Sequence, residues 1–418
     1  MRRLFSLVGM LILTTAIAAF AAGPVKIAWF HIGVNAPDKP YYQSVADAYM
    51  KLHPNVTIEI TILENEAFKA KTSTLMQSGN PPDLFQSWGG GLMSTYAEAG
   101  LLRDISKDVI GTAWGNSMAP GVLGVYQYNG KQYGMPYDMG AVAFWYNKEL
   151  LAKVGYTTFP ATWPELLTLV GKLKAAGITP IAVGAGDKWP AHFWWSYLAI
   201  RLGGKPAFQG VLSGKGSFND PAFVKAGQLL LDLNKMKPFQ DGYLAATWPD
   251  EAGIIGDGKA AMHLMGQWAP SAEAAYSVSK KGILDKEGMA PFPSVPGGKG
   301  LPTDAFGGGN GFALGKNAPD EAVDFLRFIT SKENNSTYAA TGNIIPTVKG
   351  ADVALTDPNA KMVKALVDKA GYYQLYLDQF FPPAVGGVVN DSVQTILAGT
   401  ATPAQAAAAI QKAYDANK

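Results

Sequence analysis

Residues 41–63 read YYQSVADAYMKLHPNVTIEITIL and contain a helical pattern followed by a strand pattern. The apolar residues of 41–52 recur every three or four positions, as they do on the buried face of a helix. From 56 to 63 the apolar residues alternate with polar ones, as they do in a half-buried strand. Because residues 25–30, VKIAWF, predict another strand, the chain opens with a strand, a helix and a strand.

The same alternation continues downstream. Residues 66–77 predict a second helix that ends before the GNPP of 79–82, and residues 83–86 predict a third strand. Strand–helix–strand units have right-handed crossovers and build mostly parallel sheets. The first lobe is therefore predicted to be α/β.

A second α/β lobe, richer in helix, is predicted from the residues that follow. Thr162 and Glu165 predict a capping box at the start of a helix, which Gly177 should end. The other predicted strands are 132–135, 141–146, 179–183 and 260–265, and the other predicted helices of this region are 190–202, 221–234 and 249–255. We again expect a mixed, mostly parallel sheet flanked by helices.

Residues 291–311 are rich in Gly and Pro and resemble a linker to a third domain. Only one further strand, at 305–314, is predicted beyond them, and one strand cannot form a sheet by itself. We therefore expect this strand to return to an existing sheet. The chain would then cross between the two lobes more than once.

The composition excludes several classes of protein. Of 418 residues, 48% are apolar and 16% charged, which is not the composition of disordered chains, collagens or polytopic membrane proteins. The chain has no Cys, so disulfides and thiolate metal sites are excluded. Without Arg2 and Arg3 it has 33 basic and 33 acidic residues, a balance that argues against nucleic acid as a partner.

The N-terminus predicts export. Residues 1–21 have a basic start, an apolar run from Leu7 to Ile17 and the small-residue stretch AFA at 19–21, as in a secretory signal peptide cut after Ala21. The alternative is a membrane anchor, but the apolar run is shorter than the roughly 20 residues that a bilayer span needs. A lipid anchor would need a Cys. We expect the mature chain to be free in a bacterial periplasm.

Several aromatic residues follow predicted strands instead of lying on helical stripes. They are Trp88, Trp189 and Trp268. In open α/β sheets, ligands bind beyond the carboxyl ends of strands, and an indole there suits the flat face of a sugar ring. The alternative is that these residues only pack in the core.

Polar residues occur at comparable places. Glu64, Asn65 and Glu66 follow a predicted strand, and Asp138 lies at a predicted lobe crossing. Carboxylates and amides accept hydrogen bonds from sugar hydroxyls. The alternatives are a helix N-cap for Asn65, solvent exposure for Glu66 and a purely structural role at the hinge for Asp138.

The four histidines, His31, His53, His192 and His263, lack the spacing of a metal site. We expect His31 and His192 to form hydrogen bonds near a cleft, and we expect no metal and no cofactor. The glycine runs 89–91 and 307–309 lack the residues of a phosphate loop, so they should let the backbone approach a ligand or bend. No GxSxG elbow is present, and the spacing suggests no Ser, His and Asp set. A carboxylate pair for glycoside hydrolysis is defined by a spatial separation, so the sequence neither indicates nor excludes one.

The chain resembles the extracellular solute-binding proteins of bacterial ABC importers, in the branch of maltose- and xylobiose-type receptors. The matching stretches are AYMKLHPNV at 48–56, PDLF at 82–85, YGMPY at 133–137, WYNKELL at 145–151, PATW at 160–163, GKAAM at 258–262, GQW at 266–268, and residues 318–330. They occur in family order along nearly all of the mature chain.

This resemblance implies a two-lobe clamshell of the periplasmic-binding-protein type. The N-terminal lobe would comprise residues 22–138 and 303–331, and the C-terminal lobe residues 139–302 and 332–418. Hinge segments would lie near 138–141, 302–306 and 330–332.

The resemblance also implies a carbohydrate ligand between the lobes. The residues expected to contact it are His31, Glu64, Asn65, Glu66, Trp88, Gly89, Asp138, Trp189, His192, Trp194, Trp268, Gly308, Asn310, Phe380 and Phe381. We expect no catalysis, a monomer, and delivery of the sugar to the permease subunits of an ABC transporter. The alternatives are a receptor for a glycerol phosphate or a polyamine, or an extracytoplasmic carbohydrate-active enzyme.

Overall fold

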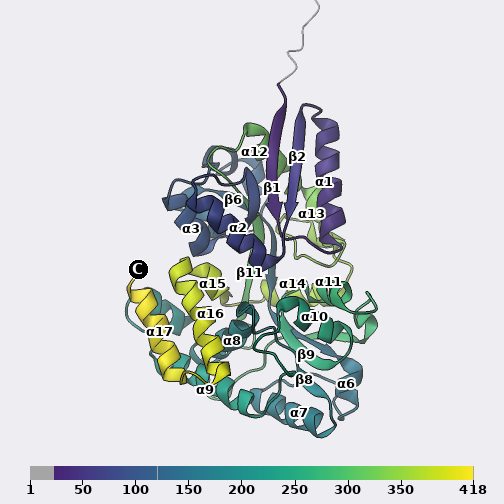
Figure 1. The fold of residues 1–418 in the computed structure, drawn as a ribbon, viewed down its shortest axis with the longest axis vertical. Helices are drawn as coiled ribbons and strands as arrows, with labels where there is room; N and C mark the ends of the chain where they lie inside the picture. Colours follow the sequence, from purple (N-terminus) through teal and green to yellow (C-terminus); the bar gives the residue numbers. More distant parts are fainter. Residues whose placement is uncertain (1–22, 120, 418) are drawn as a thin grey trace, which may run out of the picture.

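The computed structural model describes residues 23–119 and 121–417, and the predicted signal peptide lies outside them. Figure 1 shows two lobes, one above the other, joined in the middle by long strands. Each lobe has its own sheet. The two-lobe α/β prediction is therefore confirmed.

The upper lobe is built on the six-stranded sheet. Its elements from the first half of the chain are β1 (Val25–His31), α1 (Asp38–Leu52), β2 (Val56–Ile62), α2 (Asn65–Gln77), β3 (Leu84–Ser87), α3 (Gly90–Glu98), α4 (Ser106–Val109), α5 (Ala113–Asn116), η1 (Leu123–Tyr126), the hairpin β4 (Gln127–Tyr128) and β5 (Lys131–Gln132), and β6 (Gly134–Ala141). β1 pairs in parallel with β2 and β3, as the opening pattern predicts.

The lower lobe follows, with a four-stranded sheet in the order β10-β7-β9-β8. Its elements are β7 (Ala143–Asn147), α6 (Lys148–Ala152), α7 (Trp163–Ala175), β8 (Thr179–Ile181), α8 (Trp189–Leu212), α9 (Pro221–Lys235), α10 (Trp248–Gly256), β9 (Ala260–Met265), α11 (Ala269–Tyr276), η2 (Leu284–Lys286) and β10 (Glu287–Ala290). The capping box of Thr162 and Glu165 is present at the start of α7.

One expectation is wrong for this lower sheet. Only β8 and β9 pair in parallel, whereas β7 pairs antiparallel with both β9 and β10. β7 follows β6 after the single residue Val142, so the chain enters the lower lobe directly from the hinge. No crossover helix precedes β7, and such a helix is what usually makes neighbouring strands parallel. The sheet is mixed, not mostly parallel.

The remaining elements return to both lobes. They are β11 (Ala305–Leu314), α12 (Asp320–Ile329), α13 (Lys332–Ala339), η3 (Asp352–Ala354), α14 (Pro358–Asp368), β12 (Tyr373–Leu375), α15 (Leu377–Phe380), α16 (Pro383–Ala398) and α17 (Pro403–Asp415). β11 joins the upper sheet, where it pairs with β3, β6 and β12. The predicted return of this strand is confirmed.

The third lobe crossing lies later in the chain than residues 330–332. α13 and the loop after it contact the upper lobe: the Asn335 amide donates to the Tyr137 carbonyl oxygen (2.7 Å), and the Thr347 hydroxyl donates to that of Pro136 (3.0 Å). These bonds tie residues 332–348 to β6. The predicted division of the chain placed them in the other lobe.

The long helix α8 forms the centre of the lower core. It was predicted to end at Leu202, but it continues through a kink at Gly204 (φ 59°) to Leu212. Its Arg201 is fully buried and donates to the carbonyl oxygens of Phe292, Pro293, Pro302 and Asp304. This guanidinium therefore fastens the Gly- and Pro-rich segment 291–304 to the helix.

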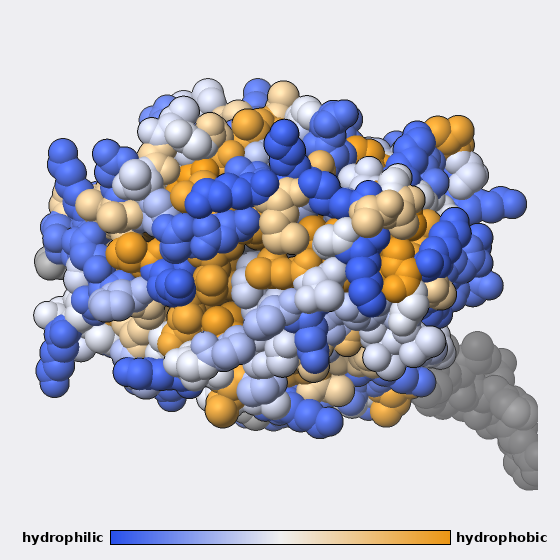
Figure 2. All heavy atoms as spheres, turned by 90° about the horizontal axis from the view of Figure 1, so that it is seen from below, coloured by the Kyte–Doolittle hydropathy of each residue, from blue (hydrophilic) through white to orange (hydrophobic). Residues whose placement is uncertain are grey.

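The surface of the lower lobe is mixed. Seen from below, hydrophobic side chains form patches that hydrophilic side chains separate (Figure 2). Scattered exposed apolar residues are usual on globular proteins. Among the described residues, no helix has both the length and the apolar character needed to span a membrane.

Candidate functional site

A cavity lies between the two lobes. It holds about 1100 Å³ of space between its lining atoms, including the opening to solvent. The loops after β1, β2 and β3 line it from the upper lobe, and residues after β9 line it from the lower lobe. The carboxyl ends of strands therefore converge on the cavity, as in other open α/β sheets.

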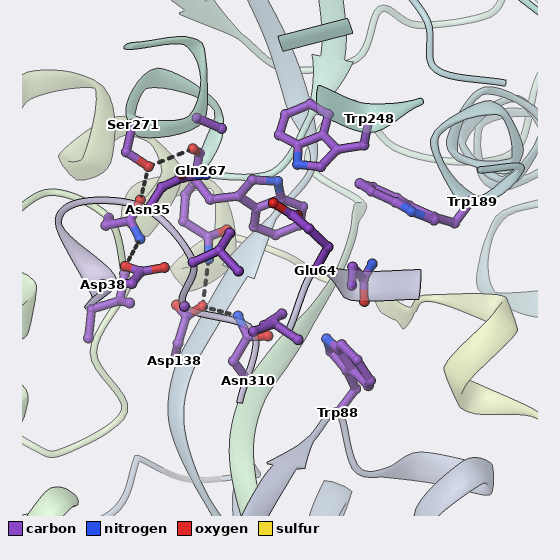
Figure 3. Close-up of a pocket in the computed structure, with 18 of the residues that line it drawn as sticks. Asn35, Asp38, Glu64, Trp88, Asp138, Trp189, Trp248, Gln267, Ser271 and Asn310 are labelled. Carbon is purple, nitrogen blue, oxygen red and sulfur yellow. Dashed lines mark hydrogen bonds between the residues drawn. The ribbon is translucent and has the colours of Figure 1, made fainter. Parts of the chain in front are cut away.

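Four tryptophans form the aromatic wall of this cavity: Trp88, Trp189, Trp248 and Trp268. Figure 3 shows Trp88, Trp189 and Trp248 around the opening, with Glu64 between them. Trp88 follows β3, Trp268 follows β9, and the other two begin α8 and α10. The three predicted tryptophans are together, and the structure adds Trp248.

Asp138 lies at the floor of the cavity and is fully buried. Its carboxylate accepts hydrogen bonds from the Gln267 amide (2.6 Å), the Asn310 amide (2.7 Å) and the Ile345 backbone N–H (2.7 Å). Burial raises the pKa of Asp138 to about 7, although these three donors act in the opposite direction. Gln267 comes from the lower lobe, so this carboxylate also links the two lobes (Figure 3).

A second polar chain crosses the cavity. The Ser271 hydroxyl of α11 donates to the Asn343 side-chain oxygen (2.5 Å), and the Asn343 amide donates to Asp38 (2.5 Å). Nearby, the Tyr276 hydroxyl of α11 donates to Glu64 of the upper lobe (2.8 Å). These contacts connect α11 to the upper lobe at two points.

Several buried polar atoms around the cavity have no hydrogen-bond partner within residues 23–119 and 121–417. They are Asn65 Oδ1, Trp189 Nε1, Gln267 Oε1, the Tyr376 hydroxyl and Gln379 Oε1. A buried polar group without a partner costs about 1–3 kcal/mol. Hydroxyl groups of a ligand can act as both donors and acceptors and would satisfy such atoms.

An ionic cluster supports the aromatic wall from behind. His263 of β9 is fully buried, nearly parallel to the Trp248 ring (9°), and lies 2.9 Å from Glu251 and 3.0 Å from Glu273. Burial lowers the pKa of His263, but the two carboxylates outweigh it and raise the pKa to about 9. The third buried carboxyl group of the cluster, Glu287, has a raised pKa because of burial and the neighbouring Glu273.

The charge on His263 should make stability depend on pH. Its pKa rises from 6.5 to about 9 on folding, so its contribution is complete below pH 6.5 and is lost as the pH rises through 9. Between pH 7 and pH 9.5 the melting temperature of the wild type should fall by about 2 °C or more beyond the fall of a His263→Gln variant. Differential scanning calorimetry of both proteins at both pH values measures the melting temperatures. An equal fall in the wild type and in His263→Gln would contradict the predicted role of His263.

Seven of the predicted ligand contacts line the cavity. They are Glu64, Asn65, Trp88, Asp138, Trp189, Trp268 and Asn310. The other eight do not line it. Those are His31, Glu66, Gly89, His192, Trp194, Gly308, Phe380 and Phe381.

Three of the residues predicted to contact the ligand do not line the cavity because their side chains are buried in the core. They are His31, His192 and Trp194. His31 packs against Trp29 and Tyr42, and burial lowers its pKa to about 3. His192 packs against Phe306, with its Nε2 3.9 Å from Asp378 of the cavity lining, and Trp194 packs against Phe144. Proximity to Trp189 in sequence did not place them in the site.

Phe380 and Phe381 also lie outside the cavity. Phe381 is buried against Phe218 and Tyr414, and Phe380 packs on Phe381. Residues just before them, Tyr376, Asp378 and Gln379, line the cavity instead. Glu66 is exposed and pairs with Lys69 (2.8 Å).

Each of the two predicted glycines allows another residue to pack closely against its backbone. Gly89 has a positive φ (68°), and a Cβ there would lie 2.4 Å from the Val125 carbonyl oxygen. A Cβ on Gly308 would lie 2.4 Å from the ring of Tyr376, which lines the cavity. The glycine at 308 therefore lets the tyrosine, not a ligand, approach the strand.

Gly308→Ala tests this role. The added methyl group should displace the Tyr376 ring, lower the free energy of unfolding by about 1–3 kcal/mol and weaken ligand binding several-fold. Urea denaturation and calorimetry measure the two effects. Gly171→Ala in α7 is the matched control, because nothing lies within 4 Å of its new Cβ. If Gly308→Ala binds the ligand with normal affinity, ligand binding does not depend on the position of the Tyr376 ring.

Sequence reasoning missed several residues of the cavity: Asn35, Asp38, Lys69, Trp248, Gln267, Ser271, Tyr276, Asn343, Tyr376, Asp378 and Gln379. Gln267 had an available signal, since it precedes Trp268 in the quoted GQW stretch. Trp248 stands before Pro249, which identified it only as a helix start. Asn343 lies in an irregular loop that no periodicity describes.

Charges in the cavity are mainly acidic. Its lining includes Asp38, Glu64, Asp138 and Asp378, while Lys69 is the one cationic side chain among the described lining residues. Arg201, the sole arginine between Arg103 and Arg327, is in the core of the lower lobe. The cavity therefore lacks the arginine cluster that a phosphate ligand would favour.

Comparison with known proteins gives a consistent result. The sequence profile described as bacterial extracellular solute-binding protein matches residues 34–336. An uncharacterised ABC transporter extracellular-binding protein of Pyrococcus horikoshii is 27% identical over 343 residues, which are 79% of this chain and 74% of that protein.

Two solved structures are similar over almost their whole length. One comes from work on xylan utilization by the thermophilic bacterium Caldanaerobius polysaccharolyticus, with a TM-score of 0.86, 27% identity and coverage of 93% of this chain and 99% of that one. The other is a chitin oligosaccharide binding protein, with a TM-score of 0.85, 27% identity and coverage of 94% and 99%. The fold is that of the two-lobe periplasmic binding proteins.

Proposed function

Because this chain belongs to the family of bacterial extracellular solute-binding proteins, we propose that it captures an oligosaccharide or small glycoside between its lobes. It would deliver this sugar to the permease subunits of an ABC transporter. The family is one of transport-binding proteins, and it acts outside the cytoplasm.

The observation that carries the proposal is the aromatic wall with polar groups beside it. Trp88, Trp189, Trp248 and Trp268 line a single cavity that also contains Glu64, Asp138 and Asn310. A pyranose has apolar faces and a rim of hydroxyls, so it needs stacking surfaces and hydrogen-bonding groups together. The names of the similar proteins, which refer to xylan utilization and to chitin oligosaccharides, support a sugar of this kind.

Ligand capture would involve closure of the lobes about the crossings near Val142 and Ala305. The Val142 N–H donates to the Phe306 carbonyl oxygen (2.8 Å), so two crossings run side by side there. A sugar that contacts both lobes binds the closed state better than the open one, and this difference in affinity shifts the equilibrium toward closure. Residues of both lobes line the cavity, which supports this account.

The remaining parts of the proposal follow from the sequence. Residues 1–21 would be removed as a signal peptide, and the absence of Cys would leave the mature chain free in the periplasm. We propose that it acts as a monomer without catalysis. The scarcity of cations in the cavity favours a neutral sugar over a glycerol phosphate.

A thermal-shift screen tests the function. The mature chain is heated with monosaccharides, maltose, cellobiose, xylobiose, diacetylchitobiose, their longer oligomers, glycerol 3-phosphate and spermidine. At least one sugar should raise the melting temperature in a concentration-dependent way, because a ligand that binds only the folded state stabilises it. Stabilisation by glycerol 3-phosphate or spermidine alone would contradict the proposal, and release of shorter sugars on long incubation would indicate an enzyme.

A further inference from the structure

A second hollow, which we call the side groove, opens beside the cavity. It is bounded by α2 and α3 of the upper lobe and by α15 and α16, and it holds about 1580 Å³ between its lining atoms, including its opening. In Figure 1, α2 and α3 lie directly above α15 and α16. The groove and the cavity share four lining residues, Lys69, Trp88, Asp378 and Gln379, so the two spaces adjoin each other at these side chains.

The side groove differs in chemistry from the cavity. Its lining includes Phe68, Met76, Phe85, Leu92, Met93 and Leu101, and most of these belong to one apolar cluster between α2 and α3. No tryptophan other than Trp88 is among the described residues that line it. Polar side chains such as Ser73, Gln77 and Thr95 also line the groove. A sugar ring placed against its apolar cluster would still leave hydroxyl groups without partners on that side, and each unpaired polar group is costly.

The groove also contains a small number of polar atoms without a partner. Thr72 and Gln379 are 4% and 8% exposed and Asn390 is half-buried, and Thr72 Oγ1, Gln379 Oε1 and Asn390 Oδ1 have no hydrogen-bond partner among the described residues. All three residues line the groove. A few polar atoms on an otherwise apolar group would match this arrangement better than the many hydroxyls of a sugar.

We propose that the side groove binds an aryl substituent on the sugar that occupies the cavity. The inference rests on the proposed function, and it specifies the ligand as a glycoside or aryl ester of a sugar. The sugar lies against the aromatic wall, the linkage passes Trp88, and the aromatic ring enters the space between α2 and α3. Trp88 contacts both parts of the ligand, since it lines both spaces.

The decisive comparison uses wild-type protein. Isothermal titration calorimetry is done with methyl and phenyl glycosides of each sugar that binds in the screen, beginning with the xylobiosides and the diacetylchitobiosides. Burial of a phenyl ring should strengthen binding about tenfold or more over the methyl glycoside. Equal affinities would overturn the inference while leaving the sugar-binding function intact. If no sugar binds at all, the proposed function itself fails.

The longer oligosaccharides of the thermal-shift screen test the alternative that the side groove binds another sugar unit. The trisaccharide is titrated beside the phenyl glycoside of the disaccharide. If the third sugar unit strengthens binding as much as the phenyl ring does, the groove accommodates sugar and the inference is overturned. We expect the trisaccharide to gain less than threefold.

A variant locates the effect in the groove. Leu92 of α3 is half-buried and lines only the side groove, so Leu92→Gln should remove most of the phenyl advantage and leave methyl glycoside affinity unchanged. Leu167→Gln in α7 is the matched control, a half-buried leucine on a helix of the other lobe. A phenyl advantage that is equal in both variants would place the ring elsewhere and overturn the inference.

Discussion

Replacement of Trp268 by alanine should weaken sugar binding about 30-fold or more. The ring lines the cavity next to Tyr376, and its centroid is 6.5 Å from that of the tyrosine. Stacking contributes about 0.5–1.5 kcal/mol beyond the burial of apolar area, and loss of that burial adds a similar or larger amount. Isothermal titration calorimetry with the sugar found in the screen measures the change.

Two variants make this test specific. Trp268→Phe keeps a smaller ring and should recover part of the affinity. Tyr156→Ala removes a half-buried aromatic residue that lies outside the cavity, beside Lys172, and should bind normally. Unchanged affinity in Trp268→Ala would exclude this residue from the site.

The Arg201→Met variant should lose about 3–5 kcal/mol of its free energy of unfolding. The guanidinium is fully buried, donates to four backbone carbonyl oxygens of residues 292–304 and lies over the Tyr197 ring at 5.2 Å. Methionine fills similar space but leaves those oxygens without donors, and each buried unsatisfied acceptor costs about 1–3 kcal/mol. Urea denaturation followed by tryptophan fluorescence measures the loss.

Arg327→Met is the matched control. Arg327 is 45% exposed in its ion pairs with Asp108 and Asp324, and exposed pairs contribute about 0–1 kcal/mol. A loss in Arg201→Met no larger than that of the control would contradict the fastening role. Near-normal sugar affinity in the folded fraction is expected, because Arg201 does not line the cavity.

The regular elements could be predicted because local rules act on them. β11 was predicted with its observed bounds, and α7 begins at the expected capping box. Short elements such as β10 and β12 were missed, whereas β3 and β8, which are as short, were predicted because each follows a predicted helix with a clear end. The bend at Gly204 ended the predicted helix too early, because a glycine pair is also a usual helix end.

The candidate site could be predicted only in part. Trp88, Trp189 and Trp268 were found because they follow strands or begin a helix at the same edge of the fold. Trp194 has the same residue type and neighbourhood in sequence, yet it points into the core. Which side of a helix faces a ligand depends on packing between lobes, and the sequence of one helix does not contain that information.

The bonds of Ser271, Asn343 and Asp38 across the cavity have a consequence for how such a receptor can change over time. In these bonds the side chains that join the lobes are hydrogen-bonded to one another. Because the same three side chains line the cavity, substitutions there should change both the fraction of closed protein and the shape of the space left for a ligand. Affinity and selectivity are therefore expected to change together at these positions.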